Sequence, residues 1–226
     1  MRKTPNKGRL RGENNLNPAF DKLNEEKKNK IIKACLEEFS DNGYENASTN
    51  SIVSKAGISK GLLFHYFENK RNIYLYLIDI SINRFLDKFY EYEAEPSKDI
   101  FERLIQSGMI KIRLALEEPQ MYKIVMEAFI DTPRGMEEEI QSRYQKIFAQ
   151  TMPNVFENLD YSKFREDIDK NKAVEFIIIF LDSLYNKYVK MAKGKATKLS
   201  NEELDLMIKE QFEFVEMVKY GLYKKE

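Results

Sequence analysis

The sequence has no tryptophan, one cysteine and one histidine among its 226 residues. A single cysteine excludes an internal disulfide, and a single histidine excludes a multi-histidine metal site. No glycine-rich phosphate loop and no Ser–His or Cys–His pair in a plausible setting stands in the chain. These absences argue against an enzyme and against a bound cofactor, although a helical enzyme remains an alternative at this point.

Long apolar runs are also missing. The longest, FIIIFL at residues 176–181, has a charged residue on each side, and it is far shorter than the ~18 residues of a membrane helix. The basic N-terminus, MRKTPNKGRLRG, is not followed by an apolar segment, so it does not predict a secretory signal. We therefore expect a cytoplasmic protein of a bacterium-like cell.

Helix breakers are few, with six prolines and nine glycines. Together with many Leu, Ile, Lys and Glu residues, this predicts an all-α fold. The apolar periodicity places helices at about residues 25–42, 50–56, 60–67, 70–92, 98–117, 119–130, 135–150, 163–193 and 201–223. Pro119, Pro133 and Pro153 are expected to separate helices.

Charge divides the chain unevenly despite a net charge of zero. Residues 1–70 hold 13 Lys and Arg against 9 Asp and Glu, and the remainder is acidic. A basic head suggests an anionic partner. We expect a flexible basic arm at 1–23, a DNA-binding domain at 24–70 and a second helical domain at 71–226. The arm is either a solubilising tail or an element that enters the minor groove of DNA.

The stretch SKAGISKGLLFHYFENK, residues 54–70, predicts a helix-turn-helix. Thr49 can cap the first helix and Gly57 can supply the positive φ of the corner. Ser59 can cap the second helix, and Lys70 can add a phosphate contact. Leu62, Leu63 and Phe67 are expected to be core, and the outward face is expected to hold Ser59, Lys60, Gly61, His65 and Tyr66. That set can donate hydrogen bonds to phosphates and base edges.

These residues resemble the TetR/AcrR family of transcriptional repressors. The resemblance rests on A-G-I-S-K-G at 56–61, on L-F-H-Y-F-x-x-K at 63–70 and on F-x-x-x-G-Y at 39–44, and it covers about residues 25–75. It implies an N-terminal three-helix DNA-binding domain and a C-terminal helical domain that binds an effector and forms a homodimer. It also implies DNA contacts by Thr49, Ser59, Lys60, Gly61, Phe64, His65, Tyr66 and Lys70. The family usually has tyrosine where this chain has Phe64, so a phosphate-directed hydroxyl is missing there.

The resemblance further implies a double-stranded, palindromic operator in the bacterial nucleoid, no membrane partner, and a homodimer built by the last two helices. An ordinary intramolecular core is the alternative reading of those helices. A small apolar or aromatic effector is expected among residues that could equally be plain core: Met109, Met121, Tyr122, Met126, Phe129, Phe176 and Phe180. The alternative function is a DNA-binding factor of the same fold without a small-molecule switch.

Overall fold

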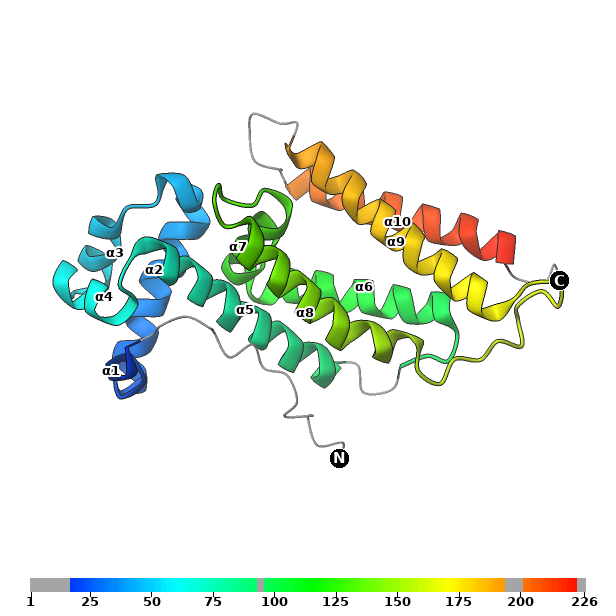
Figure 1. The fold of residues 1–226 in the computed structure, drawn as a ribbon, viewed down its shortest axis with the longest axis horizontal. Coiled ribbons are helices and arrows are strands. Elements are labelled where there is room, and N and C mark those ends of the chain that lie inside the picture. Colours follow the sequence, from blue (N-terminus) through cyan, green and yellow to red (C-terminus); the bar gives the residue numbers. More distant parts are fainter. Residues whose placement is uncertain (1–16, 93–95, 194–200, 223–226) are drawn as a thin grey trace. The chain divides into compact units, whose positions relative to one another are not determined.

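The computed structural model describes residues 17–92, 96–193 and 201–222. These residues form ten helices and no strand, so the prediction of an all-α fold is confirmed. None of the described helices is long and apolar enough to cross a membrane. The helices are α1 Pro18–Asp21, α2 Glu25–Asn46, α3 Thr49–Ala56, α4 Lys60–Phe67, α5 Lys70–Tyr92, α6 Ile100–Glu117, α7 Pro119–Ile130, α8 Glu137–Phe156, α9 Lys170–Lys193 and α10 Asn201–Leu222 (Figure 1).

The chain divides into two compact units, and the division falls inside α6 and α8. The first unit comprises residues 1–92 and 111–143, and the second comprises residues 93–110 and 144–226. Each unit has its own buried apolar side chains. The sequence predicts a domain boundary at residue 70. In the structure, α5 belongs to the same compact unit as the helix-turn-helix, so the units do not divide at that residue.

The first unit is built around α2, which contacts α3, α5 and α7. Its apolar face buries Ile31, Cys35 and Phe39, as the i, i+4, i+8 spacing predicts. The Phe39 ring lies 5.2 Å from the ring of Tyr74 on α5. Burial raises the pKa of the Cys35 thiol to about 12, so this cysteine is an inert core residue.

A buried ion pair fixes α5 against the first turns of α8 in the same unit. The guanidinium of Arg143 donates to both carboxylate oxygens of Asp79, at 2.6 and 2.9 Å. A second pair, Arg71 with Glu139, joins the same two helices with the charges reversed. A bidentate pair tolerates little displacement, so the two pairs define the register of α5 on α8.

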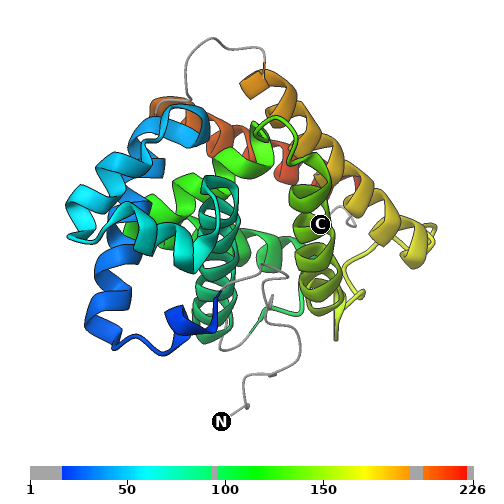
Figure 2. The same ribbon diagram turned by 60° about the vertical axis from the view of Figure 1, so that its left-hand side comes forward.

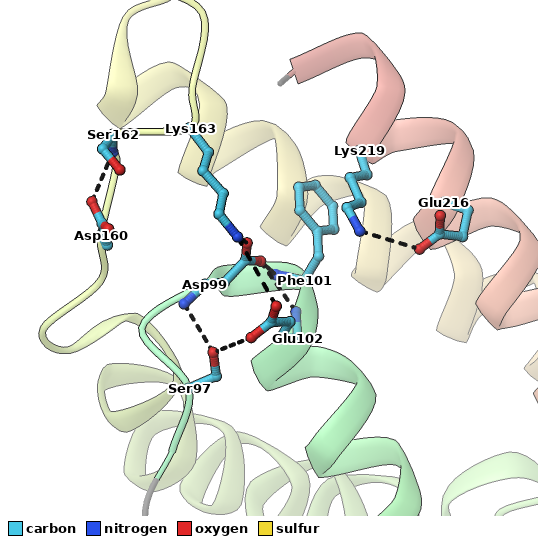
Figure 3. A network of polar contacts seen from close by, with 9 residues as sticks. All are labelled: Ser97, Asp99, Phe101, Glu102, Asp160, Ser162, Lys163, Glu216 and Lys219. Carbon is cyan, nitrogen blue, oxygen red and sulfur yellow. Dashed lines mark hydrogen bonds and ion pairs between the residues drawn. The ribbon is translucent and has the colours of Figure 1, made fainter. Parts of the chain in front are cut away.

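The second unit has a core that joins α6, α9 and α10. Its buried members are Ile100, Phe101, Phe164, Ala173, Ile177 and Val215. Beside this core, the N–H groups of Phe101 and Glu102 donate to Asp99, which caps α6 (Figure 3). The ammonium of Lys163 lies 2.9 Å from the Asp99 carboxylate, so the loop before α9 is tied to the start of α6.

Most helix boundaries lie within a few residues of the predicted ones, and four differences bear on the predicted caps and breaks. Helix α8 continues through Pro153, so the prediction of a break there is wrong. The proline removes one i to i−4 hydrogen bond, and the helix ends three residues later, at Phe156. Helix α9 begins at Lys170 instead of 163, because Asp169 accepts the N–H groups of Asn171 and Lys172.

The other two differences concern the N-terminal half. Ser48, not Thr49, caps α3, since its hydroxyl accepts the N–H of Ser51 at 3.4 Å. The short helix α1 was not expected at all, and it lies at the N-terminal end of α2 (Figure 2).

Candidate nucleic-acid interface

The joint between α2 and α3 is organised by one buried carboxylate, Glu38. One oxygen accepts the backbone N–H of Ser48 at 2.9 Å, and the other accepts the Ser51 hydroxyl at 2.5 Å and lies 3.4 Å from Lys55 Nζ. Burial alone would raise the pKa of Glu38, but the hydrogen bonds from Ser51 and Ser48 and the Lys55 ammonium lower it below its ordinary value. An ionised Glu38 therefore holds the N-terminus of α3 in place.

The corner between α3 and α4 has the predicted glycine chemistry. Gly57 has φ +68° and ψ +38°, and its N–H donates to the carbonyl of Val53 at 2.9 Å. This is the left-handed helix cap that glycine adopts without a Cβ penalty. Ser59 then caps α4, because its hydroxyl accepts the N–H of Leu62 at 3.2 Å, as predicted.

The face of α4 that is open to solvent carries most of the predicted DNA-contacting residues. Four of the exposed residues were expected there: Ser59, Lys60, Gly61 and His65. Leu63 and Phe67 are buried, also as expected. Leu62 is 37% exposed, so its prediction as a core residue is wrong. Its place one turn before His65 and next to Gly61 could have shown this, because positions i and i+3 share a helix face.

Two aromatic residues of α4 are less exposed than their neighbours. Tyr66 is only 6% exposed and its ring packs edge-on against Phe20, so the expectation that it faces outward is wrong. Phe64 is half-buried, and the Lys60 ammonium lies 6.0 Å from its ring centroid. The predicted DNA contacts of Phe64 and Tyr66 remain predictions.

Two of the predicted DNA-contacting residues, Thr49 and Lys70, lie at the starts of other helices. Thr49 is the first residue of α3 and is half-buried. Lys70, at the start of α5, donates to the carbonyl of Glu45 at 3.0 Å, and its ammonium lies 5.0 Å from the ring of Tyr44. An ammonium has three donors, so this arrangement leaves capacity for a phosphate.

A tight, strained turn links α4 to α5. Glu68 has φ +64° and ψ −52°, and the N–H of Asn69 donates to the carbonyl of Phe67 at 2.7 Å. These angles and this i to i+2 hydrogen bond are those of a γ-turn of the rare, strained kind. Asn69 also accepts the N–H of Asn72 at 2.8 Å, so it caps α5.

The segment Asn17–Leu23, which contains α1, was not revealed by the sequence. Residues 1–23 were expected to form a flexible arm, but the structure places Phe20 at 0% exposure, with its ring 4.8 Å from that of Phe67 and 5.7 Å from that of Tyr76. The basic residues of the arm, which were expected either to solubilise the protein or to enter the minor groove, lie outside the described residues: Arg2, Lys3, Lys7, Arg9 and Arg11.

The residues predicted to line an effector pocket are divided between the two units. Met121, Tyr122, Met126 and Phe129 lie on α7 in the first unit, all half-buried. Tyr122 packs against Phe85 of α5, with ring centroids 6.1 Å apart, and burial raises its pKa. In the second unit, Phe180 is half-buried and packs against the core, whereas Met109 is 57% and Phe176 49% exposed.

The fold and the solvent-facing side of α4 together define a helix-turn-helix DNA-binding protein. Comparison with known proteins gives the same class. The family model "Bacterial regulatory proteins, tetR family" matches residues 31–77. The fatty acid metabolism regulator protein of Bacillus subtilis is 30% identical over 189 residues, which are 79% of this chain and 92% of that protein.

Two further similarities extend over most of the chain. The transcriptional repressor AcnR of Corynebacterium glutamicum is 23% identical over 180 residues, 78% of this chain and 88% of the repressor. A TetR family regulator from Chloroflexus aurantiacus has the same fold, with a TM-score of 0.58 at 22% identity over 93% of this chain and 99% of that one. The chain belongs to the TetR family and is a DNA-binding transcriptional regulator, not an enzyme.

Proposed function

We propose that the protein is a dimeric repressor that binds a palindromic operator through α4 and is released by a small apolar or aromatic ligand. The observation that supports DNA reading best is the exposed face of α4. A hydroxyl, an ammonium, a bare backbone and an imidazole stand on it beside the apolar side chain of Leu62. These groups suit phosphate oxygens, base edges and thymine methyl groups. The site of action would be chromosomal DNA in the bacterial cytoplasm.

Operator selection tests this part. Purified protein should enrich a two-fold symmetric sequence from a random duplex pool, with half-sites about 34 Å apart. Replacing Lys60 or His65 by Ala should weaken binding to the selected sequence by about tenfold, and more than it weakens binding to unrelated DNA. Selection of no sequence at low salt would contradict the proposal.

The dimer proposal is supported by apolar side chains exposed on α9 and α10. Ile179 is 56% exposed on α9, and Met217 and Tyr220 are 65% and 79% exposed on α10. Phe176 lies one turn before Ile179 on α9 and is also exposed. Apolar residues repeated at helical spacing on a surface mark an interface, and paired helices of a second copy would cover them.

A pair of charge substitutions tests the dimer. Ile179→Glu and Met217→Glu should shift the protein from dimer to monomer in sedimentation velocity and weaken operator binding by at least tenfold. Lys123→Glu, an exposed residue of α7, is the matched control and should leave the oligomeric state unchanged. A wild-type monomer that still binds the operator with full affinity would contradict the proposal.

The ligand proposal is supported by the half-buried methionine and aromatic side chains of α7. Met and aromatic residues adapt to apolar ligands. Since one relative is named a fatty acid metabolism regulator, fatty acids are the first probes. A probe that raises the melting temperature should lower operator affinity, and Phe129→Ala should weaken that response. Stabilising probes that leave operator affinity unchanged would favour the alternative function, a DNA-binding factor without a small-molecule switch.

A further inference from the structure

The side chain of Asn17 connects the segment before α2 to the exposed face of α4. Its Oδ1 accepts the N–H of Ala19 at 2.9 Å, and its Nδ2 lies 3.3 Å from Nε2 of His65. Its backbone N–H donates to the carbonyl of Tyr66 at 3.1 Å. Asn17 thus contacts both the imidazole of His65 and the C-terminal end of α4.

The hydrogen-bond partners decide which way the amide faces. A backbone N–H can only donate, so the atom facing Ala19 must be the amide oxygen. The amide nitrogen, which can only donate, is then the atom that faces His65. Nε2 of the ring must therefore accept with its lone pair, and a neutral imidazole with a bare Nε2 carries its proton on Nδ1.

We infer that Asn17 is a positioning residue that holds His65 as the Nδ1–H tautomer, so that the imidazole offers DNA a hydrogen-bond donor. This inference rests on the proposed function, because it assumes that His65 meets DNA. Suitable acceptors are phosphate oxygens and, in the major groove, N7 and O6 of guanine, N7 of adenine and O4 of thymine. With the other tautomer Nε2–H would face the Asn17 amide N–H, and the hydrogen bond would be lost.

The segment that carries Asn17 is held firmly enough for this role. Three residues further on, Phe20 is 0% exposed, with ring centroids 5.4 Å from Tyr66 and 4.8 Å from Phe67. The packing of Phe20 and the backbone hydrogen bond to Tyr66 restrain the segment independently of the contact between Asn17 and His65. The amide therefore loses little further freedom when it bonds the ring.

The single histidine makes the tautomer directly measurable. In ¹⁵N-labelled protein at pH 8, long-range ¹H–¹⁵N spectra contain the signals of one imidazole. We expect Nδ1 at a protonated shift and Nε2 at an unprotonated one. Predominant Nε2–H in the wild-type protein would overturn the inference.

Asn17→Asp is the informative variant. Aspartate still caps Ala19, but its second oxygen accepts from Nε2–H, so the tautomer should invert. Asn17→Ser is the matched control, because serine keeps the cap and is too short to reach the ring; the two tautomers should then mix. An unchanged spectrum in Asn17→Asp, with the melting temperature retained, would overturn the inference.

Operator binding supplies the second readout. Asn17→Asp should weaken binding to the selected operator by about fivefold in the His65 protein. In a His65→Ala background it should change binding much less, which separates the tautomer from the added negative charge. An inverted tautomer with unchanged operator affinity, or an equal loss in both backgrounds, would overturn the role toward DNA. If the wild-type protein binds no duplex, the proposed function fails, and the spectra still decide whether Asn17 sets the tautomer.

Discussion

Glu38 on α2 and Ser51 on α3 are joined by a hydrogen bond of 2.5 Å. Glu38 is 4% exposed and accepts three further donors or cations, so removing its charge leaves several groups without their partner. The consequences reach both the stability of the fold and its dependence on pH.

Replacing Glu38 by Gln should lower the free energy of unfolding by about 2 kcal/mol at pH 7. The folded-state pKa of Glu38 lies below its ordinary value of 4.5. Its carboxylate therefore contributes stability that is fully present above the unfolded-state pKa and is lost as the pH falls through the folded-state pKa. Urea unfolding from pH 7 to pH 3 should show the variant and the wild type converging below about pH 4.5. A constant difference across this range would contradict the assignment.

The buried pair of Asp79 and Arg143 gives a second stability prediction. Arg143→Met should cost about 3–5 kcal/mol, because it leaves the Asp79 carboxylate buried without its cation. The double variant Asp79→Leu, Arg143→Met should recover part of that loss. Arg84→Met is the matched control: it breaks the more exposed pair with Glu118 and should cost under about 1 kcal/mol. Equal losses in urea unfolding for Arg143→Met and Arg84→Met would contradict the prediction.

Gly57 and Gly61 should respond oppositely to replacement by alanine. Gly57→Ala should destabilise by about 1–2 kcal/mol, since φ is +68° and the new Cβ would lie 3.2 Å from Lys30 Nζ. Gly61→Ala should stabilise by about 0.5–1 kcal/mol, because the position is helical and nothing lies within 4 Å of the added Cβ. The same methyl should weaken operator binding by roughly tenfold if the α4 backbone approaches DNA closely. Thermal unfolding and fluorescence anisotropy measure the two effects, and unchanged affinity would remove Gly61 from the interface.

Lys70 tests the electrostatic part of DNA binding. Lys70→Ala should reduce the slope of log affinity against log salt by about one unit, the value of one phosphate contact. Lys98→Ala, an exposed residue of the second unit, is the control and should leave the slope unchanged. A slope that is the same in all three proteins would show that the Lys70 ammonium serves only Glu45 and Tyr44.

The sequence predicted the helices and the glycine corner because those features are local. Gly57 and Ser59 specify their own backbone geometry, and the spacing of Ile31, Cys35 and Phe39 specifies a buried face. The docking of Phe20 and the contact of Asn17 with His65 join residues more than forty positions apart, and no periodic pattern signals them. Tyr66 shows the same limit, since its burial depends on a ring supplied by that distant segment.

The γ-turn at Glu68 restricts how α4 can move relative to α5. Only two residues separate the end of α4 from the start of α5, and they are closed by a hydrogen bond and followed at once by the Asn69 cap. Such a short, hydrogen-bonded connection cannot change its length or direction by much. A tilt or rotation of the first turn of α5 should therefore displace α4 and its exposed side chains by a similar amount. The connection acts as a rigid link and not as a hinge.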